Sequence, residues 1–374
     1  VLSLAAATDE AGNVFLAVGD SEDTTSLGVW LQRILPNGVL PWGASGRNVD
    51  PAVFGVNEQG PAIAPDGTGG CYVVWTDDRN EATLDLDVYA QRIDASGALI
   101  WGESGLVVAS RPGEQAEPRA VLLDGGVALA WLDDRNGDTD VYGVRLSSAG
   151  VHEWDSLGVP LADTSSDCSN LDTASDGAGG LLLTWQESRD FGATQIDIYA
   201  QSVRGNGQTR WSDAGISVCE EQDSQIVPHI IADGAGGSYV VWADDRGSDA
   251  WFGRKIYGQR LSDSGRPHWT ENGIALGGSD YLQQHPWLAV DAQGRLGVVW
   301  ADNRISGYED IYGQLLTPDG SRLLGSGGKV ISSARETQSF PSCAFGSDGE
   351  LVAVWRDQRD FPDYQIRMQR IDSS

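Results

Sequence analysis

The chain has 374 residues, with 54 Asp and Glu against 25 Lys and Arg, which gives a formal net charge of −29. We expect no nucleic-acid binding, because phosphate contacts need a basic surface, and no attraction to anionic membranes. No run of about 18 apolar residues is present, so membrane insertion is not expected. The 48 glycines follow no collagen period and indicate many tight turns.

Four cysteines are present, and none forms a CxxC motif, so neither a zinc ribbon nor a thioredoxin-like site is expected. Cys168 and Cys219 fall in or near predicted loops and could pair. Cys71 and Cys343 fall in predicted strands and are interpreted as small buried residues. The spacing leaves the pairing open.

A repeat with a period of about 55 residues organises the chain. Six copies carry the pattern Trp-x-[Asp/Glu]-x-Arg, and their tryptophans are Trp75, Trp131, Trp185, Trp242, Trp300 and Trp355. A seventh, degenerate copy stands first, where Trp30 to Arg33 match Tyr89 to Arg92. Repeats of this length are typical of propellers and solenoids.

Each repeat predicts four short strands, as the copy around Trp242 illustrates. The first strand starts at Pro228, and the glycine-rich segment 233–237 predicts a hairpin turn. The second strand is apolar and ends in Trp242, and an acidic loop containing Arg leads to the third. A Gly-x3-Trp-x3-Gly segment then precedes the fourth strand. No segment of ten or more residues keeps a period of 3.6, so almost no helix is expected.

Seven repeats of four antiparallel strands predict an all-β, seven-bladed β-propeller that forms a single domain over 1–374. A linear β-solenoid is the alternative, but its rungs are usually shorter. The last repeat stops before its fourth strand, so we expect the final blade to lack its outer strand, unless the natural chain continues. The expected blades are 1–55, 56–112, 113–165, 166–222, 223–280, 281–335 and 336–374.

The combination of Trp-x-Asp-x-Arg, Asp-Ile-Tyr-x-Gln-Arg and Gly-x3-Trp resembles repeats of secreted bacterial surface proteins. That resemblance covers essentially the whole chain and implies a β-propeller at the cell surface or outside the cell, without an activity. A more distant similarity is to Asp-box propellers such as sialidases. The turn from Asp94 to Trp101 lies at the corresponding place, but each of its gaps is one residue longer, and no sialidase arginine triad can be matched.

Two features present in nearly every repeat are interpreted as scaffold. Each Arg of the acidic loop is expected to pair with the Asp that opens the third strand, as in Arg79–Asp87 and Arg304–Asp310. A Gln-x-x-Pro motif precedes most first strands, with Gln59 and Pro61 as a shortened copy. Its amide is expected to satisfy backbone groups where the chain passes between blades.

One acidic loop has oxygen-bearing side chains at alternate positions, which is the spacing of a calcium loop. The loop lacks the bidentate Glu of an EF-hand, so a solvated turn is the alternative. No cofactor is otherwise required. The candidate calcium ligands are Asp134, Asn136, Asp138 and Asp140.

Positions where one copy departs from the others are the candidates for function. Trp251 and Trp287 are the two tryptophans outside the repeat pattern, and the position of Trp287 varies between blades, with Arg119 and His229 among its counterparts. We expect an aromatic patch near blades five and six that stacks on a sugar or anchors a protein loop; local packing is the alternative. The candidate ligand-binding residues are Trp251, Phe252, Tyr281, His285, Trp287, His229 and Arg119.

Catalysis has little support, because no GxSxG or HExxH motif is present. The sequence therefore favours a non-catalytic binding or structural module of a secreted or cell-surface bacterial protein, with a protein or glycan ligand at the mouth of the central channel. The alternative is a glycan-binding lectin or a carbohydrate-active propeller enzyme, of the glycoside hydrolase or lyase type.

Overall fold

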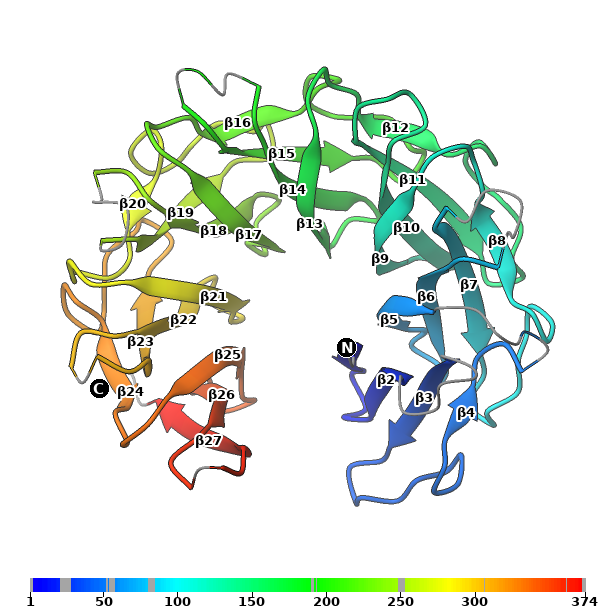
Figure 1. Ribbon diagram of the computed structural model, residues 1–374, viewed down its shortest axis with the longest axis horizontal. Coiled ribbons are helices and arrows are strands. Elements are labelled where there is room, and N and C mark those ends of the chain that lie inside the picture. Colours follow the sequence, from blue (N-terminus) through cyan, green and yellow to red (C-terminus); the bar gives the residue numbers. More distant parts are fainter. Residues whose placement is uncertain are drawn as a thin grey trace. The chain divides into compact units, whose positions relative to one another are not determined.

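The computed structural model describes residues 3–20, 28–51, 53, 58–79, 85–189, 192, 194–247, 253–305, 307–360 and 362–371. All regular structure in these ranges is β-strand, arranged in seven antiparallel sheets (Figure 1). Six sheets have four strands and the last has three, so the chain is a seven-bladed β-propeller, as predicted. No helix in the described ranges is long and apolar enough to cross a membrane.

Blades one to three are each built from four consecutive strands. Blade one consists of β1 (Ser3–Thr8), β2 (Val14–Asp20), β3 (Gly28–Ile34) and β4 (Arg47–Asn48). Blade two consists of β5 (Gln59–Pro65), β6 (Cys71–Asp77), β7 (Asp87–Ile93) and β8 (Leu106–Ala109). Blade three consists of β9 (Gln115–Leu123), β10 (Gly126–Asp133), β11 (Asp140–Ser147) and β12 (Val159–Ala162).

Blades four to seven continue in the same order. Blade four consists of β13 (Cys168–Ser175), β14 (Leu181–Glu187), β15 (Asp197–Val203) and β16 (Ile216–Cys219), and blade five of β17 (Gln225–Ala232), β18 (Ser238–Asp244), β19 (Lys255–Leu261) and β20 (Ile274–Ala275). Blade six consists of β21 (Gln283–Val290), β22 (Leu296–Asp302), β23 (Asp310–Leu316) and β24 (Lys329–Ser332). Blade seven consists of β25 (Gln338–Phe345), β26 (Leu351–Asp357) and β27 (Gln365–Ile371).

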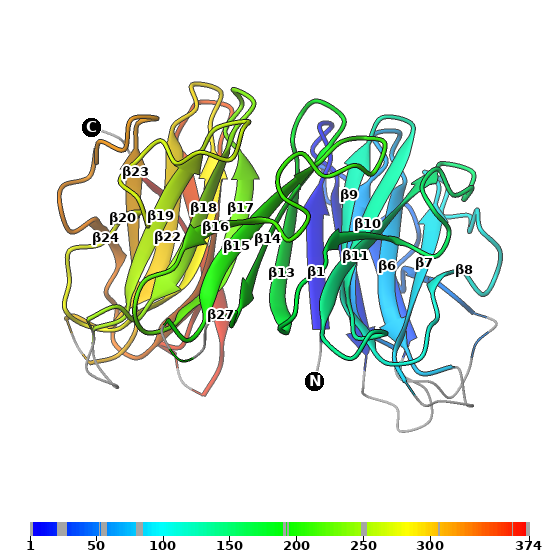
Figure 2. The same ribbon diagram turned by 90° about the horizontal axis from the view of Figure 1, so that it is seen from above.

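The chain divides into two compact units, and the division passes through the strands of blade four. The first unit runs to Thr173 and takes in Gly179–Leu181 and Val203–Thr209. The second holds Ala174–Ala178, Leu182–Ser202 and the chain from Arg210 onward. In each unit the strands run between two sets of turns (Figure 2).

The repeated tryptophans fill the space between successive blades. Trp75 is fully buried and belongs to a cluster with Phe15 and Leu31 of blade one. In the same way, Trp300 packs with residues of blade five, among them Tyr239. Burial of a large side chain stabilises the fold by about 1.5–3 kcal/mol, so this repeated position supplies much of the cohesion between blades.

The predicted pairing of each loop arginine was wrong in its partner. Arg304 pairs with Asp302, two residues before it, rather than with Asp310, and the same carboxylate accepts the indole N–H of Trp300 at 3.2 Å. The guanidinium carbon also lies 4.0 Å from the ring centroid of Tyr312. Asp302 holds the arginine because it is buried beside it at the end of β22. Burial, together with Asp302, raises the pKa of Asp310 to about 6.

The same pairing recurs in the other blades that carry the motif. The arginine pairs with the acid two residues earlier in Arg79–Asp77, Arg135–Asp133, Arg189–Glu187, Arg246–Asp244 and Arg359–Asp357. In blade five Lys255, which replaces the third-strand Asp, pairs with Asp280 at 3.0 Å. This belt of buried ion pairs is therefore scaffold, as its repetition indicated.

The glutamine of the Gln-x-x-Pro motif has the structural role that was predicted. The amide nitrogen of Gln115 donates to the carbonyl oxygens of Arg111 and Gly113. Gln225 and Gln338 contact the preceding turns in the same way. The backbone N–H of Gln283 donates to the carbonyl oxygen of Arg254, just before β19. Each first strand thus starts beside the loop that joins the second and third strands of the previous blade.

All four cysteines are buried and free of disulfide bonds. Cys168 opens β13 and Cys219 ends β16, so both lie in strands rather than in loops. Burial raises the pKa of the Cys343 thiol, and the sulfur contacts backbone carbonyl oxygens of blade six. These residues act as small core side chains.

Candidate functional site

A bulge near the start of the first strands places the candidate site. The register shifts between Gln284 and Trp287 in β21 and at the same point in β17 and β25. The residue before the proline takes a left-handed conformation in each, with φ of 54° at Val227, 53° at His285 and 51° at Phe340. This conformation is unfavourable for residues other than glycine. A repeated bulge therefore turns the residues on either side of each proline away from the regular pleat.

Four rings beside these bulges, from blades five, six and seven, form two pairs. The rings of His229 and Trp287 lie 4.8 Å apart, centroid to centroid, and those of His285 and Phe340 lie 4.4 Å apart. The guanidinium of Arg356, on β26, lies 4.6 Å from the centroid of Phe340 and 4.7 Å from that of Tyr364. We call these six residues the aromatic row; all of them belong to the second compact unit.

Several rings of the aromatic row are open to solvent. Trp287 is 40% exposed and Phe340 is 54% exposed, whereas Trp300 in the same unit is fully buried. Tyr364 is also exposed. Grouped exposed rings on a soluble protein mark an interaction surface more often than isolated ones do. The row thus combines apolar faces for stacking with imidazole, phenol and guanidinium groups for hydrogen bonding.

Burial favours a neutral imidazole at His285. Burial lowers its pKa, the nearby Arg356 and Arg254 lower it further, and Glu309 acts in the opposite direction. The guanidinium of Arg356 donates to the hydroxyl of Ser339 at 3.3 Å and has no carboxylate partner among the described residues. At neutral pH, the row therefore offers an uncharged base and a cation that is not neutralised by direct pairing.

Three of the predicted ligand-binding residues take part in the two ring pairs, His229 with Trp287 and His285 with Phe340. His229, His285 and Trp287 belong to the aromatic row, and Tyr281 is an exposed residue just before β21. Arg119 lies on β9 in the other compact unit, where it pairs with Glu117 at 3.8 Å. Trp251 and Phe252 lie outside the described residues.

Phe340, Arg356 and Tyr364 were not predicted from the sequence. Phe340 had a visible signal, because it precedes Pro341 in a Gln-x-x-Pro motif and therefore takes the bulge position of His285. Arg356 and Tyr364 follow no repeat pattern, and only the packing of β26 and the next loop against β25 brings them to Phe340.

The predicted calcium ligands are engaged in different contacts. The amide of Asn136 donates to the hydroxyl of Tyr142 at 3.0 Å, and Asp140 accepts the backbone N–H of Thr164 at 2.9 Å. Asp138 is exposed, and Asp134 is partly buried. These residues do not form a group of three carboxylates within reach of one ion, and calcium at this loop remains a prediction.

The one group of three convergent acids in the described ranges lies between blades one and two. Single carboxylate oxygens of Asp50, Glu58 and Asp77 lie within 4.8 Å of one another, and all three side chains are buried. Arg79 bridges Asp50 and Asp77. Burial, followed by the neighbouring carboxylates, raises the pKa of Glu58 to about 9. A proton held between Asp50 and Glu58 relieves their repulsion.

Glu58 takes the position that glutamine has in blades three, five, six and seven. The motif in blade two is Glu58-x-x-Pro61, so the shortened copy at Gln59 was assigned one residue too late. In blade six the amide of Gln283 accepts the N–H of Ile256 and donates to Asp302 at 2.9 Å. Glu58 accepts the equivalent N–H, from Val29, but its carboxylate has no hydrogen to donate unless it is protonated.

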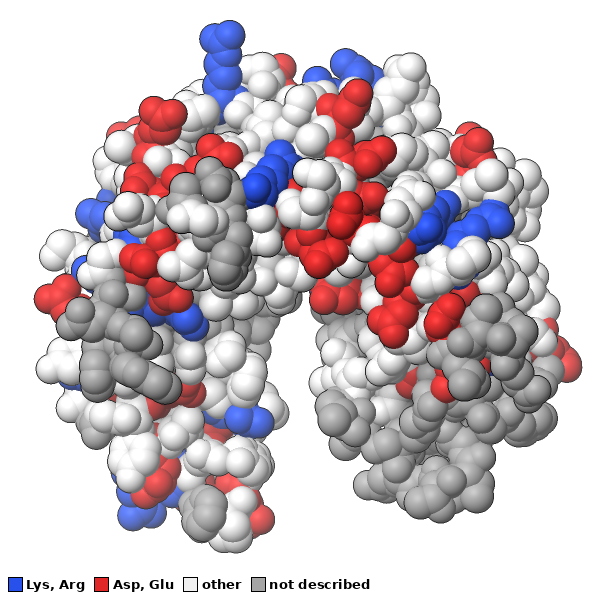
Figure 3. Space-filling model, turned by 45° about the horizontal axis from the view of Figure 1, so that its top comes forward, with Lys and Arg blue, Asp and Glu red and all other residues white. Residues whose placement is uncertain are grey.

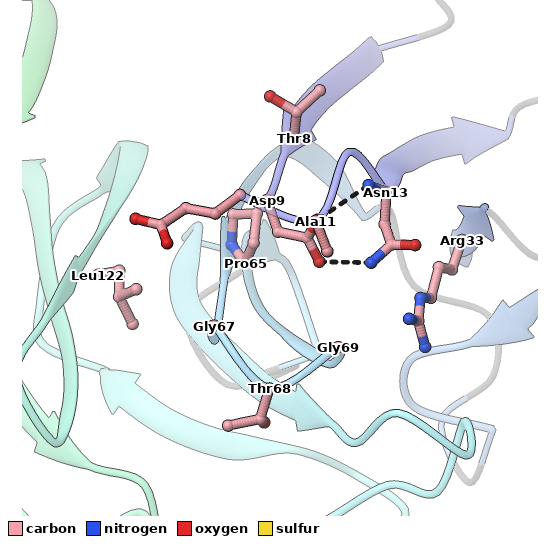
Figure 4. Close-up of a pocket in the computed structure, with 11 residues that line it drawn as sticks. Thr8, Asp9, Ala11, Asn13, Arg33, Pro65, Gly67, Thr68, Gly69 and Leu122 are labelled. Carbon is pink, nitrogen blue, oxygen red and sulfur yellow. Dashed lines mark hydrogen bonds between the residues drawn. The ribbon is translucent and has the colours of Figure 1, made fainter. Parts of the chain in front are cut away.

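A separate cavity of about 820 Å³ lies among the hairpin turns of the first unit (Figure 4). Its walls include the turn from Asp9 to Asn13, the turn from Pro65 to Gly69, and Leu122. The carboxylate of Asp9 accepts the backbone and amide N–H groups of Asn13 at 2.8 and 2.6 Å, so it closes its own turn. This cavity lacks stacked rings and convergent charges, and we regard it as a gap between turns.

The charged surface agrees with the composition. Acidic side chains are spread over the face shown in Figure 3, between smaller groups of Lys and Arg. The aromatic row differs from this background, since its own residues carry no carboxylate.

Comparisons with known proteins support the fold. Neither a protein-family model nor a curated protein sequence matches the chain. Among solved structures, a polysaccharide lyase of family PL25, an ulvan lyase bound to -[GlcA(1-4)Rha3S]-, is similar with a TM-score of 0.57 and 8% identity, over 98% of this chain and 91% of the lyase.

Two puromycin-hydrolysing proteins are also similar. A puromycin hydrolase S511A mutant complexed with PGG matches with a TM-score of 0.56 and 16% identity, over 98% of this chain and 51% of that chain. A puromycin-hydrolyzing peptidase of Mycobacterium tuberculosis matches with a TM-score of 0.57 and 14% identity, over 100% of this chain and 52% of that chain. The chain thus spans about half the length of these hydrolases. At such identities the likeness concerns the fold alone.

Proposed function

We propose that the chain binds an acidic polysaccharide through the aromatic row, as a module of a secreted or cell-surface bacterial protein. The observation that carries the proposal is the exposure of Trp287 and Phe340 next to His229 and His285. Flat aromatic faces bind the apolar faces of sugar rings, and the polar edges of the row supply hydrogen bonds.

Arg356 favours a sugar that carries a carboxylate or a sulfate. Its planar guanidinium is held between Phe340 and Tyr364 and has no carboxylate partner in the described part of the chain. A preoriented guanidinium binds anionic oxygens in a charge-assisted geometry. The similarity in fold to an ulvan lyase, whose ligand is named as containing GlcA and Rha3S, supports the same class of ligand.

The net charge of −29 opposes an acidic ligand only at long range. Charges more than about 10 Å away are largely screened at an ionic strength of 0.1 M. The contact with Arg356 is local, whereas Arg254, which also lies near His285, is paired with Asp245 at 2.7 Å. Moderate salt should therefore strengthen binding, because it screens the repulsion between distant carboxylates and the ligand. Binding should still depend on Arg356.

The test compares a soluble polyuronate with its carboxyl-reduced form as titrants. Wild-type protein should bind the polyuronate, and the variant Trp287→Ala/Phe340→Ala should lose at least about 100-fold in affinity, because the loss of each stacking ring should cost at least about 1.4 kcal/mol, or about tenfold. Trp30→Ala is the matched control, since Trp30 is also 40% exposed but lies in blade one. If the double variant and the control bind equally well, the proposal is wrong.

A second candidate, polysaccharide lyase activity at the same place, is favoured by His285 and Arg356. A lyase needs a neutral base to remove a proton beside a carboxylate and a cation to stabilise the resulting charge. The lowered pKa of His285 and the nearby guanidinium of Arg356 match those roles. Lyase activity would be established if the protein releases unsaturated uronate products and if His285→Gln binds the polymer but releases none. If the wild-type protein binds the polymer without releasing any product, the chain is a binding module.

A further inference from the structure

The buried acids between blades one and two depart from the repeat in their charge. Each copy of the motif pairs one acid with one arginine, here Asp77 with Arg79, and the two charges cancel. This junction contains two further buried carboxyl groups, those of Asp50 and Glu58. When both are ionised, the junction therefore carries two negative charges more than the others.

The two added acids occupy positions that are uncharged at the other junctions. Arg79 contacts Asp50 on the preceding blade, and the corresponding arginines of blades five and seven contact Cys219 and Ser332. The counterparts of Glu58 are glutamines and a cysteine. Neither added charge is therefore needed for the pairing that recurs between blades. The remaining counterparts of Asp50, by strand register, are Ala109, Ala162 and Gly277.

The added carboxylates converge with Asp77 on one place. Single oxygens of the three groups lie within 4.8 Å of one another. This span fits the two sides of a Ca²⁺ ion, whose ligand oxygens lie at about 2.3–2.6 Å. Asp77 is the most fully engaged of the three, because it also accepts the indole N–H of Trp75 at 3.0 Å and the N–H groups of Arg79. Asp50 and Glu58 are the better candidates for ligands.

Asp50 keeps one buried oxygen without a hydrogen-bond donor. The residue is 0% exposed, and its Oδ2 atom accepts from Arg79, whereas no donor reaches Oδ1. Arg79 cannot supply the missing donor, since its side-chain nitrogens already contact Asp77, Asp50 and the carbonyl oxygen of Ser104. Glu58 accepts only the backbone N–H of Val29 through Oε2. Buried carboxylates of this kind need a proton or a cation between them.

We propose that this junction binds a Ca²⁺ ion through Asp50 and Glu58, with Asp77 as a neighbouring negative charge. Carboxylate oxygens suit Ca²⁺, in contrast to metals that prefer imidazole or thiolate ligands. The two charges of the ion balance the two that the junction has in excess. In calcium-free solution a proton between Asp50 and Glu58 takes this place. The bound ion links the end of blade one to the start of blade two, within the first compact unit.

The test uses the full chain, freed of metal with a chelator, and CaCl2 as the titrant in isothermal titration calorimetry. We expect one ion to bind at this junction and about 1 mM CaCl2 to raise the melting temperature. Hydrogen exchange of the Val29 amide should slow, because its N–H donates to Glu58. MgCl2 should bind at least about tenfold more weakly, since Mg²⁺ requires shorter ligand distances and a stricter geometry.

Two variants give the junction residues that other blades already use. Glu58→Gln introduces the glutamine of blade six, and Asp50→Ser introduces the serine found at position 332. Both should fold, should bind Ca²⁺ at least about tenfold more weakly, and should lose the effects of CaCl2 on the melting temperature and on Val29. Asp138→Asn is the matched control, because Asp138 is exposed and lies in the loop whose spacing resembles a calcium loop. It should keep both effects.

The proposal is overturned if CaCl2 acts equally on the wild-type protein and on both variants, or if it leaves the melting temperature and Val29 of the wild-type protein unchanged. Loss of both effects in Asp138→Asn would place the ion in that loop and would overturn the proposal as well. Equal affinity for Ca²⁺ and Mg²⁺ would overturn the choice of Ca²⁺. None of these outcomes depends on a glycan, because the aromatic row belongs to the other compact unit.

Discussion

Two tryptophans of blade six, Trp300 and Trp287, differ in every respect that matters for function. Trp300 recurs in six blades, is fully buried and has its indole N–H bonded to Asp302. Trp287 occurs at its position once, is 40% exposed and contacts the ring of His229 in a tilted arrangement. The first holds neighbouring blades together, and the second faces solvent on the bulge of β21. Repetition therefore identifies scaffold, and departure from the repeat identifies the candidate site.

The comparison predicts the largest effect for the buried ring. Trp300→Ala should lower the free energy of unfolding by about 3–5 kcal/mol, since a large core side chain leaves a cavity and an unpaired Asp302. Trp287→Ala should change it by less than about 0.5 kcal/mol, as is usual for exposed positions. Urea denaturation of the two variants side by side measures both values. Similar losses in both would remove the distinction between scaffold and site.

A second comparison sets Glu58 of blade two against Gln283 of blade six. Because the pKa of Glu58 is raised from its ordinary value near 4.3 to about 9 in the folded chain, the folded state holds a proton that the unfolded state releases between these pH values. The contribution of Glu58 to the free energy of unfolding should therefore be fully present below about pH 4.3. It should be lost as the pH rises toward 9.

Glu58→Gln should remove that dependence and should stabilise the protein at pH 8 by about 1–3 kcal/mol, the usual penalty for an unsatisfied buried polar group. The variant restores the amide that blade six uses. Melting temperatures of both proteins from pH 5 to 9 test this, with Gln59→Glu, one residue along in an exposed position, as the control. Parallel curves for wild type and Glu58→Gln would contradict the assignment.

The smallest predicted effect concerns charge within the aromatic row. Arg356→Met should weaken binding of the polyuronate about tenfold, which corresponds to about 1.4 kcal/mol, and should leave binding of its carboxyl-reduced form unchanged. The aliphatic replacement keeps contact with Phe340 while it removes the cation. Equal weakening for both polysaccharides would indicate that Arg356 acts through packing alone.

Much of the fold follows from the sequence, because a tryptophan every 54–58 residues and an apolar strand before it leave few alternatives. The ion-pair partner of Arg304 could not be chosen in this way, since Asp302 and Asp310 are both close in the chain. Burial at the end of β22 decides in favour of Asp302. Likewise, the sequence does not show the role of Glu58 when the motif of blade two is placed at Gln59 and not at Glu58.

The candidate site was predictable only where a repeat position was visibly altered. Trp287 and His229 stand out because their counterparts differ in size and charge. Arg356 and Tyr364 join the row through contacts between β26, its following loop and β25, and such contacts between elements have no period in the sequence. The bulge explains why the ring of Phe340 contacts that of His285. Phe340 lies in a motif that the sequence shows, but the sequence alone does not place it beside His285.

The most direct test of the account is the affinity of the soluble polyuronate for Trp287→Ala/Phe340→Ala relative to Trp30→Ala, measured by isothermal titration calorimetry. The account predicts a loss of at least about 100-fold for the double variant, with unchanged melting temperature and with wild-type affinity for the control. Wild-type affinity of the double variant would contradict the claim that the altered positions of the repeat form the binding site.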